Sequence, residues 1–351
     1  MHISPFKGFI PDLTKISFND AFYQHMREDF NSVWQRGLFK SIDESASFYI
    51  LEIEDHRHIA TGLISLTSME DYTRHRILKH EKTIAAKEKI HLGLHASRKA
   101  MIKPAALLIR KHAGLNKIIS AIKTENHPVL VVKFPDHQTL QRLWKITDTR
   151  LIQKIAALFD KNIDQAIIAD GHHRFASLAH RHSIKNPKHI LTIYFSPEEM
   201  KVSTFYRIIN KLKSESYQAV IDRLKRITVG WRAVDTIKPA KGVIHLICQD
   251  QLFKFRLKTQ KDDPIQLTFS QKIIQKVFNI HNESNSKRIR YVEYPDLPEE
   301  HRLIVDQHRE ALIFILPPLT AQQVLKNKKL LPPKSTMFTP RIINGLIVVK
   351  E

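Results

Sequence analysis

The glycines of this chain are few and far apart, which restricts the folds that it can build around a phosphate. Nine glycines occur among 351 residues, and no two of them lie within ten residues of each other. Average usage would place glycine at about 7% of positions. The spacing excludes the Rossmann fingerprint G-x-G-x-x-G, the Walker A loop and the nucleophile elbow G-x-S-x-G. A phosphate or nucleotide site in this chain must therefore be built in another way.

Length and hydrophobic content indicate a soluble globular protein with two domains or one large one. Hydrophobic residues make up 42% of the chain and charged residues 26%. No segment approaches the roughly 18 unbroken apolar residues that a membrane span requires, and the N-terminus lacks the basic start and apolar run of a signal peptide. The single cysteine, Cys248, cannot form an internal disulfide. We therefore expect a cytoplasmic protein without membrane contact.

The chain is strongly basic: 56 lysines and arginines against 35 acidic residues give a formal net charge of +21. Such a field attracts nucleic acids, phosphates and other anions. The densest basic segments, residues 79–89, 98–103 and 326–329, are short or mixed, and no recognition-helix, zinc-finger or RNA-binding signature accompanies them. We therefore favour a generally basic, solvated surface, with a dedicated nucleic-acid face as the alternative.

Apolar residues recur at spacings that alternate between helix and strand. Helical periodicity predicts helices at residues 18–36, 84–99, 115–123, 149–159, 217–226, 270–278 and 321–326. Apolar or alternating runs predict strands at 47–53, 59–66, 105–109, 129–134, 163–169, 190–195, 243–248, 252–257 and 311–316. The alternation predicts an α/β fold of the α+β kind rather than a helical bundle. Because the element order changes after residue 196, we expect two domains, 1–198 and 199–351.

The segment from Asp170 to Arg174 has the features of an anion site. An apolar run meets Asp170-Gly171 and turns directly into a helical pattern, so the first helical N–H groups and the positive end of the helix dipole lie together. Gly171 would let the backbone approach an anion closely. His172, His173 and Arg174 would add donors, making a phosphate cradle with one glycine.

Two other interpretations of this segment stay open. In the first, Asp170 caps the helix while the histidines lie on its exposed face. In the second, which is weaker, His172, His173, His180 and His182 bind zinc. Adjacent histidines point apart on a helix, and no acid or cysteine falls at a familiar ligand spacing.

The string IIADGHHRFASLA closely resembles the signature of a bacterial and archaeal family, domain of unknown function 1015. Three further segments resemble the same family: GLISLTSMEDYTRHRILKHEKT at 62–83, VFNIHNESNSKRIRYVE at 277–293 and LLPPKSTMFTPRIINGLIVV at 330–349. That family in turn resembles the ParB/sulfiredoxin fold, in which a similar Gly-x-x-Arg contacts nucleotide phosphates. Some relatives of that fold are free-serine kinases, which move a phosphoryl group from ADP or ATP to L-serine.

The resemblance implies a nucleotide site at Gly171, His172, His173 and Arg174, with ATP or ADP and Mg²⁺ as cofactors. Asp170 and His172 become candidate catalytic residues, and Asp170 also becomes a candidate magnesium ligand. An amino acid would be the second substrate.

The motif His80-Glu81-Lys82-Thr83 matches the family's HEKT. Phosphoryl transfer needs positioning, positive charge and a group that accepts the proton of the attacking hydroxyl. Glu81 is the candidate base, or alternatively a magnesium ligand, and His80 is a further catalytic candidate. Lys82, Thr83 and Arg76 would bind the phosphates. From the residues alone, Glu81 and Lys82 form a solvated pair at a helix start.

The motif Pro332-Pro333-Lys334-Ser335-Thr336 matches the family's PPKST and places a lysine and two hydroxyls on a stiffened turn. We expect the tail at 330–340 to return to the nucleotide pocket, although a stiff structural corner is equally compatible with the residues. Two basic sites, Arg207 and the pair Lys287-Arg288, also fall where the family has cations.

The chain departs from the family in several places. It lacks the proline-rich segment with a Pro-Tyr-Asp core that follows the opening Pro-Phe in most relatives, and His91, Lys99 and Phe205-Tyr206 replace other residues. These changes indicate an altered substrate or a binding shell without turnover. The leading prediction is a small-molecule kinase with L-serine as acceptor. The alternatives are a non-catalytic nucleotide-binding regulatory module, ParB-like with nucleic-acid contact, and a phosphate-ester hydrolase.

Overall fold

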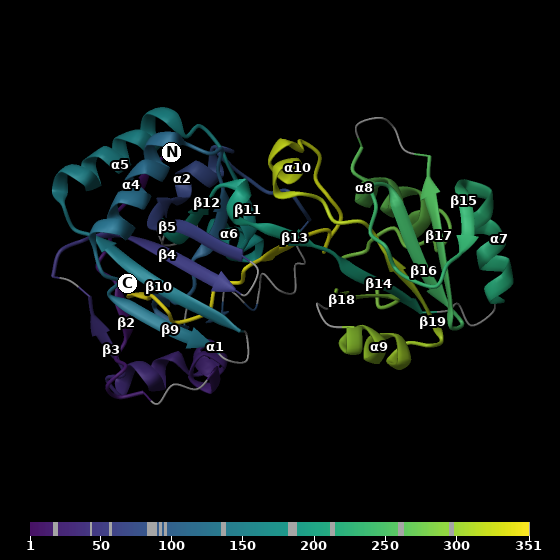
Figure 1. Cartoon of the computed structure of the whole chain (residues 1–351), viewed down its shortest axis with the longest axis horizontal. Coiled ribbons are helices and arrows are strands. Elements are labelled where there is room, and N and C mark those ends of the chain that lie inside the picture. The colour runs from purple at the N-terminus through teal and green to yellow at the C-terminus, as the bar shows by residue number, and fades with distance from the viewer. Residues whose placement is uncertain are drawn as a thin grey trace. The chain divides into compact units, whose positions relative to one another are not determined.

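The computed structural model divides the chain into two compact units (Figure 1). Unit 1 comprises Met1–Lys79, Ala85–Lys201 and Pro340–Glu351, and unit 2 comprises His80–Ile84 and Val202–Thr339. The structure describes residues 1–16, 20–42, 44–55, 58–82, 90, 93–94, 97–134, 138–181, 188–210, 215–258, 263–294 and 298–350. Within these residues, no helix has the length and apolarity needed to cross a bilayer.

Unit 1 is built on a mixed nine-stranded sheet with the order β6-β11-β8-β12-β5-β4-β10-β9, to which β1 adds beside β5. Its strands are β1 (Ile3–Ser4), β4 (Phe48–Asp55), β5 (His58–Ser68), β6 (Ile77–Leu78), β8 (Ala105–Leu108), β9 (Leu130–Phe134), β10 (Thr139–Ile146), β11 (Ala166–Asp170) and β12 (His189–Phe195). The pairs β11–β6 and β12–β8 are parallel, and the other pairs are antiparallel. The mixed pairing confirms the predicted α+β class.

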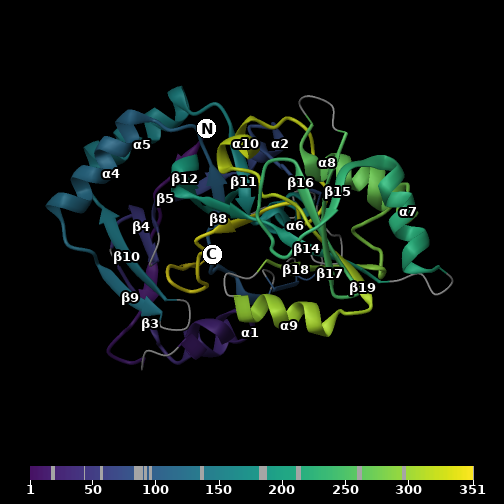
Figure 2. The same ribbon diagram turned by 45° about the vertical axis from the view of Figure 1, so that its right-hand side comes forward.

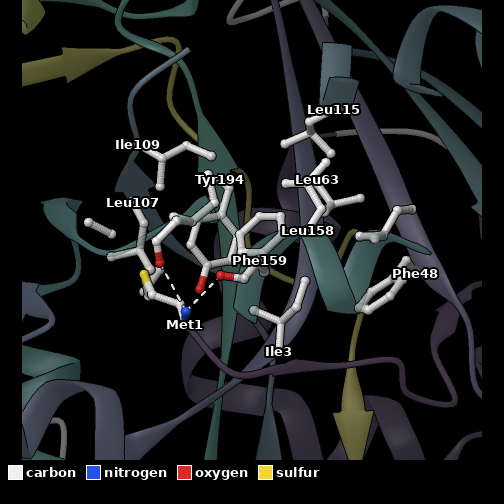
Figure 3. Packing of buried hydrophobic residues seen from close by; sticks show 14 of the residues in the cluster. Met1, Ile3, Phe48, Leu63, Leu107, Ile109, Leu115, Leu158, Phe159 and Tyr194 are labelled. Carbon is white, nitrogen blue, oxygen red and sulfur yellow. Dashed lines mark hydrogen bonds between the residues drawn. The ribbon is translucent and has the colours of Figure 1, made fainter. Parts of the chain in front are cut away.

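Helices cover this sheet and bury its main core. The helices of unit 1 are α1 (Asp20–Gln35), α2 (Met69–Thr73), α4 (Ala113–Glu125), α5 (Thr149–Asn162) and α6 (His172–Arg181), with a 3₁₀ turn η1 (Pro197–Glu199). Apolar side chains of α4, α5 and α6 pack with those of the central strands in one cluster. Figure 3 shows part of it, where Phe48, Leu63 and Leu158 pack near Met1 and Phe159. The amino group of Met1 donates to the carbonyl oxygen of Phe159 at 2.7 Å.

A smaller apolar cluster lies under α1. Met26, Phe30 and Val33 of this helix pack against Ile102 and Val348. Two short sheets frame the cluster: β2 (Phe9–Pro11) with β3 (Phe39–Ser41), and β7 (Ala100–Met101) with β21 (Val349–Lys350). The C-terminal segment is thereby bound into unit 1 by backbone pairing.

Unit 2 is built on a six-stranded antiparallel sheet with the order β15-β17-β16-β19-β14-β18. Its elements are β14 (Phe205–Asn210), α7 (Tyr217–Ile227), β15 (Thr228–Ala233), β16 (Val243–Cys248), β17 (Gln251–Leu257), α8 (Ile265–Phe269), η2 (Ser270–Gln275), β18 (Ile289–Glu293), α9 (Pro298–Gln307), β19 (Ala311–Ile315) and α10 (Ala321–Lys326). A two-stranded sheet joins β13 (Lys201–Ser203) to β20 (Met337–Thr339).

The two faces of this sheet bury separate clusters. Side chains of α7, α8 and η2 pack on one face with Phe255 and Phe314. Ile304 and Val305 of α9 pack on the other face with Ile208. Figure 2 accordingly shows α7 and α8 together and α9 apart from them. The element η2 is a π-helix that continues α8.

Most predicted elements are confirmed. Asp148 is the N-cap of α5, as predicted, and its Oδ1 accepts from the backbone N–H of Leu151 at 2.8 Å. The predicted helix 84–99 lies mostly outside the described residues, and residues 270–278 form a π-helix with a following turn rather than a uniform α-helix. Strands β10, β14, β15 and β18 and helix α9 were not predicted from the sequence.

Candidate functional site

In unit 1, the turn between β11 and α6 holds Gly171 in a backbone conformation that only glycine adopts easily. Gly171 has φ of +103°, and its carbonyl oxygen accepts from the N–H groups of Arg174 and Phe175 at 2.9 and 3.1 Å. A Cβ at this position would lie 2.8 Å from Nη2 of Arg174 and 2.9 Å from Cβ of Ala105. The turn therefore requires glycine for two reasons, backbone conformation and space.

The residues that flank Gly171 form a cluster of cations around one carboxylate, which we call the Arg174 cluster: Lys103, Asp170, Arg174 and Arg341. Arg174 donates from Nη2 to Oδ2 of Asp170 at 2.8 Å and from Nη1 to the carbonyl oxygen of Lys103 at 2.5 Å. Nζ of Lys103 lies 3.6 Å from Oδ2 of Asp170. Three cations facing one carboxylate leave an excess of positive charge, which suits a multiply charged anion such as a phosphate.

The pKa values of the Arg174 cluster reflect this crowding. Desolvation would raise the pKa of Asp170, but its side chain is 54% exposed, so Lys103 and Arg174 prevail and the pKa lies below the usual range. Burial lowers the pKa of Lys103, and Arg174 and Arg341 lower it further against the opposing effect of Asp170. Asp170 is thus a charged anchor for two cations rather than a group able to take up a proton.

The two histidines after Gly171 differ in exposure. His172 is 6% exposed, and His173 is half-buried, with its carbonyl oxygen accepting from Ser177 Oγ. The alternative in which both histidines lie on an exposed helix face is therefore wrong for His172. The zinc alternative depended on His180 and His182, whose side chains lie outside the described part of the chain.

A small apolar cavity adjoins the Arg174 cluster. It has a volume of about 70 Å³, and Lys103 and Arg174 line it together with Met101, Leu178 and Leu191. Ligand pockets usually measure about 300–1,000 Å³. The cavity is therefore too small for a whole nucleotide, and the cluster offers a phosphate site at the surface.

In unit 2, the HEKT and PPKST motifs lie side by side through backbone pairing. The N–H of Lys82 donates to the carbonyl oxygen of Leu331 at 3.0 Å, and the N–H of Leu331 donates to the carbonyl oxygen of His80 at 2.8 Å. Glu81 and Leu331 form a parallel bridge. This pairing brings residues that are about 250 positions apart in the sequence into contact.

Glu81 is the centre of the resulting group, which we call the Glu81 cluster: His80, Glu81, Lys334, Ser335 and Thr336. Its Oε2 accepts from the backbone N–H of Ser335 at 3.2 Å and from Oγ1 of Thr336 at 3.5 Å, the upper limit for a hydrogen bond. Burial raises the pKa of Glu81 to about 7, against the opposing effects of Lys334 and these hydrogen bonds. Only 15% of its side chain is exposed.

His80 and Thr336 support this carboxyl group. Nε2 of His80 lies 2.6 Å from Oγ1 of Thr336 and 3.9 Å from Oε2 of Glu81. If the hydroxyl of Thr336 donates to Glu81, Nε2 of His80 must carry the proton that Oγ1 accepts. His80 is 2% exposed and therefore acts through Thr336.

The PPKST turn is a stiff corner, which is one of the two alternatives that the sequence left open. Oγ of Ser335 donates to the carbonyl oxygen of Pro332 at 2.7 Å, which closes the turn. Lys334 has φ of +56°, and its Nζ lies 4.9 Å from the centre of the Phe205 ring. The turn is thus a stiff corner, and the same corner presents Ser335 and Thr336 to Glu81.

Arg207 lies buried beside this turn. It is 1% exposed, and its Nη2 donates to the carbonyl oxygen of Lys334 at 3.4 Å. Burial lowers its pKa, while Tyr291, Glu283 and Glu81 act in the opposite direction. Arg207 therefore supports the PPKST turn from within and has little access to a ligand.

Glu283 and its two partners were not predicted from the sequence. Oε2 of Glu283 accepts from the hydroxyl of Tyr291 at 2.7 Å, and Oε1 accepts from Oγ of Ser270. Both glutamate and tyrosine lie in the segment 277–293 that resembles the family, but only Lys287 and Arg288 were singled out there. The signal that could have found it was an acidic residue close to the basic pair within a segment that resembles the family.

A cavity of about 420 Å³ in unit 2 is lined by Glu283 and by Lys82. Hydroxyl and amide groups of Ser270, Gln271 and Asn282 complete much of its polar lining. Its volume lies within the usual range for ligand pockets. This cavity could accommodate a small polar molecule.

Arg76 and Lys82 are among the predicted phosphate ligands that belong to neither cluster. Arg76 is paired in unit 1 with the fully buried carboxylate of Asp71, and its Nη2 lies 2.8 Å from Nδ1 of His2. Thr83 lies outside the described residues. Of the other predicted residues, Asp170, Gly171 and Arg174 come together with one another in unit 1, and those of the Glu81 cluster in unit 2.

The carboxylates predicted as magnesium ligands have other partners. Asp170 is bound to Arg174 and lies beside Lys103, whereas Glu81 accepts from Ser335 and has a pKa near 7. Within the described residues, no group of three or more His, Cys, Asp and Glu side chains is arranged to hold a metal ion. Neither Asp170 nor Glu81 is part of such a group among these residues.

The fold and the two clusters define an α+β protein with one cationic cluster and one buried carboxyl cluster. The chain belongs to the family described as "Protein of unknown function (DUF1015)", whose model matches residues 11–284. This match confirms the resemblance drawn from the sequence motifs. No curated protein matches the chain.

Three solved structures resemble the chain at low sequence identity. A conserved hypothetical protein from Pyrococcus furiosus is 18% identical, with 80% of this chain and 94% of that chain covered and a TM-score of 0.42. A free serine kinase in complex with AMP is 17% identical, with 81% and 91% covered and a TM-score of 0.44. SbnI with a C-terminal truncation, from Staphylococcus aureus, is 12% identical, with 79% and 82% covered and a TM-score of 0.44. At these values the likeness identifies no substrate and no residue role.

Proposed function

We propose that the protein is a small-molecule kinase that transfers a phosphoryl group from ATP or ADP to a hydroxyl, with L-serine as the first acceptor to test. The observation that carries the proposal is the Glu81 carboxyl group, buried beside Lys334 with a pKa of about 7. A general base works best when its pKa lies near the operating pH. The family resemblance contributes the choice of donor and acceptor.

The proposed step uses Glu81 as the proton acceptor. Glu81 takes the proton of the acceptor hydroxyl, whose oxygen bonds to the terminal phosphorus of the donor. The bond between that phosphorus and the bridging oxygen breaks and releases ADP from ATP, or AMP from ADP. Lys334 offsets negative charge that develops beside Glu81.

The proposal assigns the acceptor to the cavity of unit 2 that Lys82 and Glu283 line. Lys82 supplies positive charge in this cavity, and Lys103 and Arg174 supply it in the anion site of unit 1. His80 positions Glu81 through Thr336 and takes no part in the proton transfer itself.

The test is the conversion of L-serine to O-phosphoserine, followed by phosphorus NMR with the magnesium salts of ATP and ADP as donors. We expect phosphoserine with the intact protein and at least about a hundredfold slower formation with Glu81→Gln, since general-base catalysis contributes roughly 10²–10⁴ in rate. Glu300→Gln, an exposed glutamate on α9, is the matched control and should retain the full rate. Absence of phosphoserine with both donors would reject the proposal.

A further inference from the structure

A hollow of about 450 Å³ in unit 2, remote in sequence from both motifs, is lined by cations. In the part of the chain that the structure describes, its lining consists of Ile227, Val277 and five basic residues: Arg223, Arg226, Lys258, Lys272 and Lys276. They come from α7, the residue after β17, η2 and the turn that follows η2. We call this the α7–η2 cleft.

Two of these cations have partners that hold them in place. Arg223 donates from Nη1 and Nη2 to the two carboxylate oxygens of Glu215 at 2.7 Å each. Nζ of Lys272 donates to the carbonyl oxygen of Lys258 at 2.6 Å, which brings two lysines close together. Arg226, Lys258 and Lys276 are exposed at the rim.

The positive charge is denser here than in the chain as a whole. Residues 223–258 contain nine lysines and arginines and only two acidic residues. Three of these basic residues, Arg223, Arg226 and Lys258, line the α7–η2 cleft, where Lys272 and Lys276 join them. Five basic residues around one hollow suit an anionic ligand.

Aromatic side chains lie on the same side of the sheet. Trp231 and Phe253 are half-buried, with ring centres 5.4 Å apart, and Trp231 stacks on Phe255 with an interplanar angle of 3°. Nζ of Lys225 lies 6.0 Å from the centre of the Trp231 ring. Partly exposed aromatic rings among cations are the combination by which proteins bind single-stranded nucleic acids, with the cations tracking phosphates and the rings stacking on bases.

We infer that the α7–η2 cleft and Trp231 form a binding surface for single-stranded nucleic acid. The cations of the cleft contact the phosphates, and Trp231 stacks on a base. This surface is independent of the proposed phosphoryl transfer. The structure therefore favours a specific partner for part of the +21 charge, which the sequence alone attributed to a generally basic surface.

The first experiment measures binding of a fluorescein-labelled dT20 or U20 to the full-length protein by anisotropy at several salt concentrations. For single strands, the slope of log K against log salt is about −0.7 per phosphate neutralised. Arg226→Ala/Lys276→Ala should therefore weaken binding and reduce the slope by about 1.4. Arg226→Lys/Lys276→Arg keeps the charge and should bind normally.

The matched control is Lys117→Ala/Lys154→Ala, which removes the same charge from exposed positions on α4 and α5. This variant should retain the slope and the affinity. Equal loss in both double variants would mean attraction by the whole basic surface and would overturn the assignment to the cleft. Absence of binding at low salt would overturn it as well.

The second experiment distinguishes a nucleic acid from other polyanions. Oligonucleotide binding should quench tryptophan fluorescence, and Trp231→Phe, which keeps an aromatic ring on Phe255, should abolish that quenching while the other two tryptophans remain. Heparin should bind without this quenching. If heparin binds as tightly as the oligonucleotide and neither quenches Trp231, the cleft recognises charge alone and the nucleic-acid assignment is wrong.

Discussion

At the scale of the residue, Gly171 offers a direct test of the Arg174 cluster. In Gly171→Ala, the new Cβ would meet the guanidinium of Arg174 and the side chain of Ala105 at a φ of +103°. We expect a loss of stability above 2 kcal/mol, because the backbone conformation alone costs roughly 1–2 kcal/mol. Urea unfolding would measure the loss, and ATP titration would show weaker binding because Arg174 must move.

Gly37→Ala is the control for this substitution. Gly37 ends α1 with a φ of +65°, but nothing lies within 4 Å of a Cβ at that position. Gly37→Ala should therefore lower the free energy of unfolding only by the cost of the backbone conformation, about 1 kcal/mol. It should leave nucleotide binding unchanged. Equal losses in the two variants would show that Arg174 and Ala105 yield easily and that the turn does not hold the guanidinium in place.

The raised pKa of Glu81 predicts two pH dependences. The folded protein binds this proton more tightly than the unfolded chain, so the protonated form stabilises the fold below about pH 4.5 and that contribution disappears as pH rises through about 7. Relative to Glu81→Gln, the intact protein should lose up to ~3 kcal/mol of unfolding free energy across this window. Over the same window kcat/KM for the proposed transfer should rise, because the base must be deprotonated.

Denaturant unfolding and rate measurements at matched pH values would check both dependences. A flat stability difference between pH 4.5 and 8 would show that Glu81 titrates as an ordinary exposed glutamate. A rate that falls as pH rises through 7 would give Glu81 the role of an acid instead.

The sequence could predict those site residues whose environment is local. Gly171 stands between an apolar run and a helical pattern, so its turn could be recognised from adjacent residues. The surroundings of Glu81 could not, because Ser335 and Thr336 lie more than 250 residues away and meet it through the pairing of residue 82 with Leu331. Read locally, Glu81 and Lys82 formed a solvated pair. Burial by residues that are distant in the sequence raises the pKa of Glu81, and the sequence around Glu81 does not show this burial.

At the scale of the element, ion pairs bind strand β10 to its neighbour β4. The charged residues that form them interrupt the apolar pattern by which a strand is predicted from the sequence. Nη1 of Arg142 donates to Glu52 at 2.7 Å and to Glu54 at 2.6 Å on the adjacent strand β4. Glu52 is only 6% exposed. Arg142→Ala should destabilise unit 1 by about 1–3 kcal/mol, because it leaves a buried carboxylate with less compensation. Urea unfolding at neutral pH would measure the loss.

An exposed ion pair provides the comparison. Arg309 donates from Nη2 to Asp306 at 3.0 Å, with side chains that are 63% and 44% exposed. Arg309→Ala should cost at most about 1 kcal/mol, as surface pairs usually do. If Arg142→Ala costs no more than this, Lys123, which also pairs with Glu52, compensates the carboxylate alone.

Strands with a continuous apolar run were predictable, whereas β10, whose pattern is interrupted by polar residues, was not. Strands β11 and β12 are buried apolar runs and were predicted close to their observed bounds. In β10, Gln141, Arg142 and Lys145 interrupt the pattern, and the pairing with β4 makes it a strand. The π-helix η2 likewise has the apolar periodicity of a helix, and its widened turn is visible only in the three-dimensional structure.

At the scale of the whole molecule, the two units are discontinuous in the sequence. His80–Ile84 belongs to unit 2 although the chain on both sides belongs to unit 1, and Pro340–Glu351 returns to unit 1. The order of elements along the chain gives no sign of these exchanges, because each depends on a few backbone pairs such as Val349 with Met101. The mixed α+β class was predictable from element order, whereas the ParB/sulfiredoxin character of unit 1 stays a prediction from the family resemblance.

The net charge of +21 predicts how salt affects the stability of the whole chain. Self-repulsion of like charges weakens the folded state, and the Debye length shortens to about 10 Å at 0.1 M ionic strength. Raising sodium chloride from 20 to 200 mM should therefore increase Tm. Sodium sulfate at equal ionic strength should increase it further, because a divalent anion also binds the Arg174 cluster and stabilises the folded state by mass action.

Arg174→Ala separates the two contributions to this salt effect. The variant removes one of the three cations that face Asp170, so it should lose the additional sulfate effect and keep the chloride effect. Because sulfate also strengthens apolar burial in any protein, only the difference between the variant and the intact chain measures anion binding. A Tm that falls with chloride would mean that ion pairs such as Arg142 with Glu52 outweigh the self-repulsion. If sulfate raises the Tm of Arg174→Ala as much as that of the intact chain, the Arg174 cluster of unit 1 is not a phosphate site.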